Sequence, residues 1–423
     1  MDTNLKSENK DNRSLYCWGF GKYGQVGREG INYSINPNKI IISDIDLSDE
    51  IFMINGGEFH NAILTANSKL YMFGKNSNGQ LGLGDTLCTF SPSLLQLPNN
   101  RKVIKVACGG EHTLALTEEG NLFSWGLNIF GQLGLAHFSF KNTPNLVDLK
   151  LEEDEEINDI AAGAQHSVFS TNNNNIYSCG CGKTYALGNG KTDNLNVFTR
   201  IDEFNFNDEI DKLSCGVYHT ACIIKKERVY LWGKGDILQY EKPTLINIYQ
   251  NLSPTKNKRN EITYKDIKIG DDFVLLLTYN DDLFLMGSNK SGQLGCKNYI
   301  SRKSFEKLDL NDKVKTIECG YNYIYAFTNS KKIYCWGNNK FGQLSLTDCS
   351  LCNEPKFLEK LSSFSPYKLS CGAYHLLAIF SKTIEQETNA DNLFEAYNKI
   401  IKVGSLPKII DGTNLNALKK QEF

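Results

Sequence analysis

The chain has 423 residues, of which 41% are apolar, 22% are charged and 11% are aromatic. A single hydrophobic core stops growing near ~250–300 residues, so this length indicates either two domains or a repeat architecture. The formal net charge of −2 at pH 7 argues against direct binding to nucleic acid or to an anionic membrane surface, because both need a basic field.

The first segment, residues 1–13, is polar and contains cations and carboxylates in similar numbers. It has no apolar stretch of the kind that forms a secretory signal. Apolar runs elsewhere, such as Phe273–Leu277, are far shorter than the ~20 residues that span a bilayer. We therefore expect a disordered N-terminal segment in an intracellular protein of the cytoplasm or the nucleus, without a membrane partner.

From residue 14 onward the chain repeats two patterns. The first is usually an aromatic residue followed by glycine and a glycine-rich turn, as in Trp125-Gly126 and the later Gly131-Gln132-Leu133-Gly134. The turn is weaker after Gly180 and absent after Gly233. The first glycine of the pattern recurs every 50 to 55 residues, at Gly19, Gly74, Gly126, Gly180, Gly233, Gly287 and Gly337.

The second pattern alternates with the first and places a glycine three residues before a histidine. Phe273 and Tyr323 replace the histidine in the fifth and sixth copies. Five of the six histidines of the chain stand at this position, namely His60, His112, His166, His219 and His375. Each pattern therefore occurs seven times.

Each repeat contains short apolar or alternating runs separated by turn residues, which are typical of β-strands. In one repeat these runs are 103–107, 113–116, 122–125 and 144–147. Four short strands repeated seven times predict an all-β fold, a seven-bladed β-propeller with four-stranded blades over residues 14–381. We expect its tryptophans to pack in the core between blades.

The order of the two patterns predicts how the ring closes. The chain begins with the Trp-Gly half of a repeat, residues 15–27, and the repeats end with the Gly-x-x-His half, residues 369–380. Neither half buries its apolar face alone. Pairing them completes the last blade from both termini and removes two exposed strand edges.

The pair Trp-Gly-x-Asn-x-x-Gly-Gln-Leu-Gly and Cys-Gly-x-x-His-x-x-Ala-Leu resembles the regulator of chromosome condensation repeat family. The resemblance covers residues 14 to 381 and implies the seven-bladed propeller. It also implies two alternative functions, since some members exchange nucleotide on the small GTPase Ran and others are protein-binding modules. The expected partner is therefore a protein, and under the exchange alternative it is a small GTPase.

Two features favour a non-catalytic interaction platform over an exchange factor. Ran exchangers carry an extra β-hairpin wedge, and the even spacing of the patterns leaves no blade with room for one. The basic N-terminal tail that would grip chromatin is also missing. Guanine nucleotide exchange on a Ran-like GTPase remains the alternative.

The resemblance further implies that the repeat histidines lie near the mouth of the ring together with the acidic residues beside them. The alternative is that each histidine is structural and bonds the backbone of its own blade. The candidate partner-binding residues are Glu58, His60, Glu111, His112, His166, His219, Asp271, Asp272 and His375.

No pattern indicates an enzyme, a catalytic residue or a cofactor. The sequences Gly182-Lys183-Thr184 and Gly190-Lys191-Thr192 end like phosphate-binding loops, but Tyr177 and Tyr185 replace the required earlier glycine. Thirteen cysteines, an odd number, argue against a disulfide framework. We expect free thiols and no metal site, with a metal or redox role of Cys349 and Cys352 as the alternative.

Charged loops and the C-terminal tail complete the chain. The acidic run 152–156 and the basic run 256–259 are expected to be solvated loops. In the tail, residues 382–423, an apolar stripe of Leu393, Tyr397, Ile400 and Ile401 predicts a short helix over 392–403. This helix would either pack on the propeller or bind a partner.

Overall fold

The computed structural model of the chain describes residues 12–42, 49–202, 208–248, 262–362 and 364–382. Residues 13–381 form one compact unit, and residues 1–12 and 382–423 are grouped apart from it. The expected tail helix over 392–403 and nearly all of the N-terminal segment lie outside the described residues. Within them, no helix is long and apolar enough to cross a bilayer.

The propeller unit is all-β, and its strands form seven four-stranded antiparallel sheets, as predicted. Two single-turn 3₁₀ helices, Pro98–Asn100 and Glu359–Leu361, lie in loops between blades. We number the blades from the first sheet that the chain completes in sequence order.

The first three blades run from residue 51 to residue 200. Blade 1 consists of β3 (Ile51–Gly56), β4 (His60–Thr65), β5 (Leu70–Gly74) and β6 (Thr89–Leu95). Blade 2 consists of β7 (Val103–Cys108), β8 (His112–Thr117), β9 (Leu122–Gly126) and β10 (Lys141–Leu146). Blade 3 consists of β11 (Ile157–Ala162), β12 (His166–Thr171), β13 (Ile176–Gly180) and β14 (Leu195–Arg200).

The next three blades follow the same order. Blade 4 consists of β15 (Ile210–Cys215), β16 (His219–Ile224), β17 (Arg228–Lys234) and β18 (Gln239–Ile246). Blade 5 consists of β19 (Tyr264–Ile269), β20 (Phe273–Thr278), β21 (Leu283–Gly287) and β22 (Arg302–Leu308). Blade 6 consists of β23 (Val314–Cys319), β24 (Tyr323–Thr328), β25 (Ile333–Asn338) and β26 (Leu351–Phe357).

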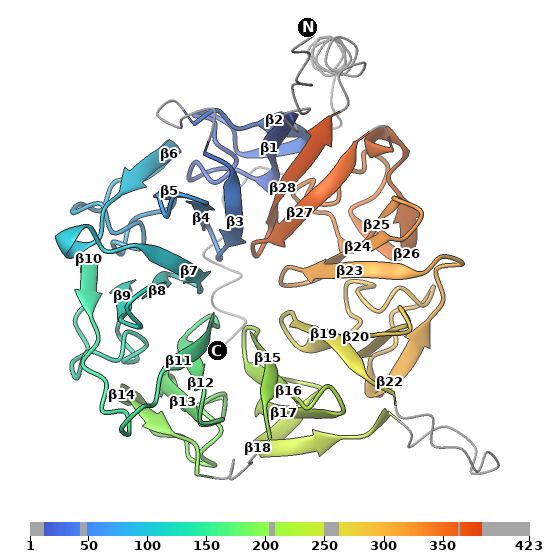
Figure 1. Ribbon diagram of the computed structural model, residues 1–423. Helices are drawn as coiled ribbons and strands as arrows, with labels where there is room; N and C mark the ends of the chain where they lie inside the picture. Colours follow the sequence, from blue (N-terminus) through green and yellow to red (C-terminus); the bar gives the residue numbers. More distant parts are fainter. Residues whose placement is uncertain (1–11, 43–48, 203–207, 249–261, 363, 383–423) are drawn as a thin grey trace, which may run out of the picture. The chain divides into compact units, whose positions relative to one another are not determined.

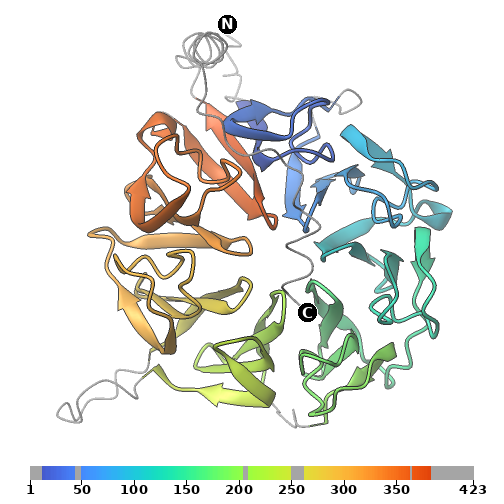
Figure 2. The ribbon, with the colours of Figure 1, turned by 180° about the vertical axis from the view of Figure 1, so that it is seen from behind.

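The seventh blade joins the two ends of the propeller unit, which confirms the predicted closure. Its strand order is β2-β1-β28-β27, with β1 (Asn12–Phe20), β2 (Tyr33–Lys39), β27 (Ser365–Cys371) and β28 (His375–Lys382). Figures 1 and 2 show these blue and red strands side by side in one sheet. The first strand of each blade is nearest the central channel and the fourth is outermost (Figure 1).

The hydrophobic core lies between neighbouring blades. Leu64 and Met72 of blade 1 pack in one cluster with Phe123 and Trp125 of blade 2, and comparable clusters join other pairs of blades. All four tryptophans are fully buried. The indole nitrogen of Trp125 donates to the carbonyl oxygen of Gln80 in the preceding blade at 3.0 Å. The indole nitrogens of Trp18, Trp232 and Trp336 also donate to an oxygen of the preceding blade, so each of the four tryptophans fastens its blade to the one before it.

The glycine of this pattern is required because of its backbone conformation. Gly74 has a φ of +111°, and a Cβ there would meet the carbonyl oxygen of Phe59 at 2.5 Å. An L-residue would be strained on both counts. The thirteen cysteines are all free, as expected.

Candidate functional site at the mouth of the channel

The seven turns between first and second strands meet at one end of the channel, which we call the mouth. A ring of backbone hydrogen bonds joins them around a small cavity of about 90 Å³. Each N–H donates to a carbonyl of the following blade: Glu58 to Gly109, Gly110 to Gly163, Ala164 to Gly216, Val217 to Gly270, Asp271 to Tyr321, Tyr321 to Ala373, and Ala373 to Gly57. The ring does not depend on side chains, so the turns can vary in sequence without losing it.

The Gly-x-x-His spacing has a steric cause. A Cβ on Gly109 would collide with the imidazole of His112 in the same turn. In blade 5, where Phe273 replaces the histidine, its ring fills the same space against Gly270. The glycine thus leaves room for a ring folded back under its own turn.

The five repeat histidines are buried, with at most 1% of each exposed. The Nε2 atom of His112 lies 2.9 Å from the hydroxyl oxygen of Ser167 in the next blade. Since this hydroxyl donates to the carbonyl of Gln132 at 2.6 Å, the histidine must be the donor in the first bond. The corresponding partners are Thr113 for His60, Thr220 for His166 and Asn61 for His375.

The expectation that each histidine bonds its own blade's backbone is therefore wrong for four of the five. Only His219 does so, through the carbonyl of Leu238 at 3.0 Å. The reason lies in the residue after the ring position, because blade 5 has Val274 where blades 1 to 4 carry a polar side chain. His219 therefore has no such partner in the next blade, and its ring bonds to the backbone of its own blade instead.

Burial keeps these histidines neutral. It lowers the pKa of His60, His112, His166 and His375 to about 3, and it also lowers the pKa of His219. A buried neutral ring offers a partner neither charge nor contact surface.

The four acidic candidates occupy different environments. Glu58, Glu111 and Asp271 are partly exposed in the turns. Glu111 forms an ion pair with Lys75 and accepts a hydrogen bond from the Asn78 amide at 2.7 Å. The structure thus brings these three carboxylates to the mouth.

Asp272 is buried instead and has structural contacts. Its carboxylate accepts the backbone N–H groups of Ile237 at 2.7 Å and Leu238 at 3.1 Å, and lies 3.9 Å from Nε2 of His219. The loop that it holds, residues 235–238, is the shortened one after Gly233. Burial raises the pKa of Asp272.

A group of aromatic rings at the mouth was missed by the sequence reasoning. We call it the mouth cluster: Phe20, Tyr23, Phe59, Tyr321, Phe341 and Tyr374, from blades 6, 7 and 1. Phe20 and Phe341 have ring centroids 4.9 Å apart, and Phe59 stacks on Tyr374 at 6.1 Å. Every ring except Phe20 is partly exposed. In the sequence, the aromatic residues Phe59 and Tyr374 directly before His60 and His375 could have indicated this cluster.

The mouth is suited to recognition by contact. Partly exposed aromatic rings lie in a rigid frame, with the ammonium of Lys75 5.4 Å from the ring centroids of both Tyr23 and Phe59. In the part of the chain that the structure describes, no three His, Cys, Asp or Glu side chains are arranged to hold a metal ion.

Comparison with known protein families identifies the repeat of this chain. A model of the regulator of chromosome condensation (RCC1) repeat matches residues 67–116, 119–170, 173–223 and 332–379. A second model of the same repeat matches residues 103–132, 157–184 and 314–343, so that the two together span more than half of the chain.

Curated relatives and solved structures are similar to this chain. The ultraviolet-B receptor UVR8 of Arabidopsis thaliana is 28% identical over 70% of this chain and 65% of its own length. The probable E3 ubiquitin-protein ligase HERC4 of Mus musculus is 31% identical over 58% of this chain, but this is only 22% of that protein. The crystal structure of Prp20p from Saccharomyces cerevisiae superposes with a TM-score of 0.74 at 17% identity, covering 92% of this chain and 95% of that one.

The chain spans less than two thirds of the length of these curated relatives, and its likeness to the solved structure concerns the fold. The repeat matches, the seven four-stranded blades and the closing blade agree with one another. This protein is a member of the regulator of chromosome condensation (RCC1) repeat family.

Proposed function

We propose that this protein is a non-catalytic interaction platform that presents the mouth of its propeller to a protein partner. The observation that carries the proposal is the mouth cluster, with the carboxylates of Glu58, Glu111 and Asp271 in the same ring of turns. Large rings held in a rigid frame are the groups that dominate binding energy in protein interfaces.

The carboxylates indicate the charge of the partner. Acidic side chains beside aromatic rings favour a surface with lysine or arginine, since opposite charges accelerate association and fix orientation. The binding properties of Prp20p toward Gsp1p and histones, proteins bound by a propeller of the same fold, support a protein ligand. The five buried histidines and Asp272 would then act on binding only by holding the turns in place.

The test uses charge reversal at the mouth. We expect Glu58→Lys and Asp271→Lys each to weaken capture of a partner from cell extract by about tenfold, mainly through slower association. Glu241→Lys is the control, because Glu241 is exposed on the outermost strand β18 of blade 4. Thermal unfolding of each variant checks that the fold is unchanged. Equal capture by all three variants would place the interface elsewhere.

Nucleotide exchange on a Ran-like GTPase is the alternative that the same experiment addresses. EDTA removes Mg²⁺ and nucleotide from GTPases in the extract, and an exchange factor binds the nucleotide-free form more tightly than the loaded form. Stronger capture of a small GTPase in the presence of EDTA would support exchange. Capture that EDTA leaves unchanged supports the platform.

A further inference from the structure

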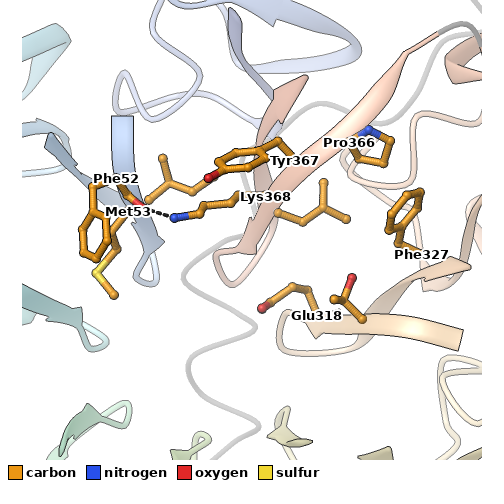
Figure 3. A pocket seen from close by; sticks show the side chains of 10 residues that line it. Phe52, Met53, Glu318, Phe327, Pro366, Tyr367 and Lys368 are labelled. Carbon is orange, nitrogen blue, oxygen red and sulfur yellow. Dashed lines mark hydrogen bonds between the residues drawn. The ribbon is translucent and has the colours of Figure 1, made fainter. Parts of the chain in front are cut away.

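A second surface lies at the beginning of the first strands, away from the turns in which those strands end. It is a pocket of about 340 Å³ lined by the first strands of blades 6, 7 and 1 and by one residue of the second strand of blade 6. Phe52 of β3 lines one side and Phe327 of β24 the other, with Pro366, Tyr367 and Lys368 of β27 between them (Figure 3). Most of the lining is apolar.

The apolar character of this surface is not a requirement of the fold. In every blade, the pairing of the first and second strands shifts by one residue near its beginning and leaves a bulge residue. In blades 7, 1 and 2 the bulge residues are Tyr367, Phe52 and Ile104, which are 47%, 52% and 45% exposed. The other four blades carry Asn158, Asp211, Lys265 and Lys315 there.

Three neighbouring blades therefore expose large apolar side chains at a position where the other four are polar. A bulge directs a side chain out of the regular pleat, so the bulge itself places these residues at the surface. Contiguous exposed apolar side chains are typical of an interaction site.

Cations lie on the aromatic rings of this surface. The ammonium of Lys368 donates to the carbonyl oxygen of Phe52, as the dashed line in Figure 3 shows. It lies 4.9 Å from the Phe52 ring centroid. The Arg13 guanidinium is 3.8 Å from the ring of Tyr367, and the Lys315 ammonium is 5.8 Å from the ring of Phe327.

The carboxylates at the pocket are paired with cations, but in the described part of the chain two of its lysines have no carboxylate beside them. Glu318, which also lines it, is paired with Lys268 at 2.7 Å, and Glu50 is paired with Arg13 at 3.2 Å. Among the described residues, neither Lys315 nor Lys368 has a carboxylate within 4.0 Å. Burial, together with the nearby Arg13, lowers the pKa of Lys368. A carboxylate placed beside Lys368 would therefore be favourable.

We propose that this pocket binds an acidic, apolar segment of a partner protein. A large apolar side chain of the segment enters between Phe52, Phe327 and Tyr367, and flanking carboxylates pair with Lys315 and Lys368. The exposed bulge residues continue over three blades, which suits an extended peptide better than a small molecule. The site uses none of the mouth residues, so it does not depend on the function proposed for them.

The experiment uses the full chain and a synthetic fluorescent peptide with a central Phe-Leu pair flanked by Asp and Glu. We expect fluorescence anisotropy to show binding that Lys368→Glu weakens by about tenfold or more, and that rising salt weakens as well. Lys212→Glu is the matched control, since Lys212 also follows the bulge residue, in blade 4, and is exposed. It should bind as the wild-type chain does.

Two further comparisons separate the apolar and charged contributions. A peptide with Lys in place of Asp and Glu, and another with Ser in place of Phe-Leu, should both fail to bind. Phe52→Ser alters a half-exposed side chain and should also weaken binding, which keeps the test valid if Lys368→Glu does not fold.

Three results would overturn the proposal. The first is no binding of the acidic peptide at millimolar concentration, or equal binding by the Lys368 and Lys212 variants. The second is a wild-type dimer in sedimentation that Phe52→Ser dissociates, which would make a second copy the occupant. The third is loss of peptide binding in Asp271→Lys, which would assign the peptide to the mouth. The capture experiment at the mouth is judged separately and can fail or succeed independently.

Discussion

At the scale of single residues, the repeat histidine works together with the residue that follows it. His112 donates to Ser167 of the next blade, and Ser167 itself directly follows His166. A His-Ser or His-Thr pair therefore both gives a bond forward and receives one from behind. Where blade 5 has Phe273-Val274 instead, the chain of side-chain bonds stops at His219.

These buried histidines predict a loss of stability in mild acid. Their pKa of about 3 in the fold is below the ordinary value of 6.5, so only the unfolded chain takes up protons between these two values. The free energy of unfolding should therefore be highest above pH 6.5 and fall as the pH decreases toward 3. Each histidine contributes up to about 1.4 kcal/mol per pH unit.

Chemical denaturation at several pH values between 7 and 5 measures this slope. We expect His112→Gln to be less stable than the wild-type chain but to show a shallower dependence on pH. His137→Gln, at the sixth histidine and outside the Gly-x-x-His turns, serves as the control. An unchanged slope in His112→Gln would contradict the proposed origin of the dependence.

The buried contacts of Asp272 predict that replacing it lowers the stability of the fold without altering the exposed surface of the mouth. Asp272→Ala leaves the N–H groups of Ile237 and Leu238 without their acceptor, and Leu238 is only 1% exposed. We expect a loss of about 2–3 kcal/mol, measured as a lower midpoint of urea unfolding. Asp236→Ala, which removes an exposed ion pair with Lys290, should cost below about 1 kcal/mol. Similar midpoints for the two variants would be evidence against a structural role of Asp272.

The histidine positions were predictable from the sequence, and their bonding partners were partly so. The polar residue after each of His60, His112, His166 and His219 is visible in the sequence, but its role becomes clear only when neighbouring repeats are stacked. The mouth cluster and the pocket are harder to foresee, because Phe20 and Phe341 meet only after the ring has closed.

At the scale of secondary structure, the sequence predicts inner strands better than outer ones. The expected strand 103–107 corresponds to β7 (Val103–Cys108), but the expected 144–147 is β10 (Lys141–Leu146). The outer strand is mostly half-buried or exposed and carries little apolar alternation, so nothing in its sequence marks where it begins. Four strands per blade followed from the short runs within each repeat, and closure by both ends followed from the order of the two patterns.

Closure predicts that β1 is indispensable. Deleting residues 1–27 removes β1, which lies between β2 and β28 in the seventh sheet. Two strand edges and the core around Leu15 and Val26 would then be exposed. We expect aggregation or loss of cooperative thermal unfolding, followed by circular dichroism and calorimetry.

Two matched deletions control for the loss of length. Removing residues 1–11 or 388–423 leaves every described strand intact, so both shortened chains should melt as cooperatively as the full chain. A sharp transition in the 1–27 deletion would show that the ring does not need its closing strand.

At the scale of the whole molecule, the ring of backbone hydrogen bonds gives the mouth a fixed shape. Exchange of nucleotide requires a group that enters the phosphate and Mg²⁺ site of the GTPase and stabilises the empty form. Docking on a flat face with equal affinity for both forms changes nothing. All strands of the described residues belong to the seven sheets, which leaves no additional hairpin among them.

We therefore expect micromolar amounts of this protein to release labelled GDP from Ran no faster than buffer alone. The measurement is loss of fluorescence from Ran loaded with a fluorescent GDP, beside an exchanger of known activity. A rate similar to that of the exchanger would mean that a loop of this chain performs the task of the wedge.

The closing blade also has a consequence for folding during synthesis of the chain. The strands β1 and β2 leave the ribosome first, but β28, the neighbour of β1, is translated more than 350 residues later. At ~5–20 residues per second, this gap lasts on the order of tens of seconds. For that time β1, with side chains such as Leu15 and Trp18 that are buried in the finished ring, has no partner on its β28 side. We therefore expect this open edge to be prone to pairing with other chains until β28 emerges.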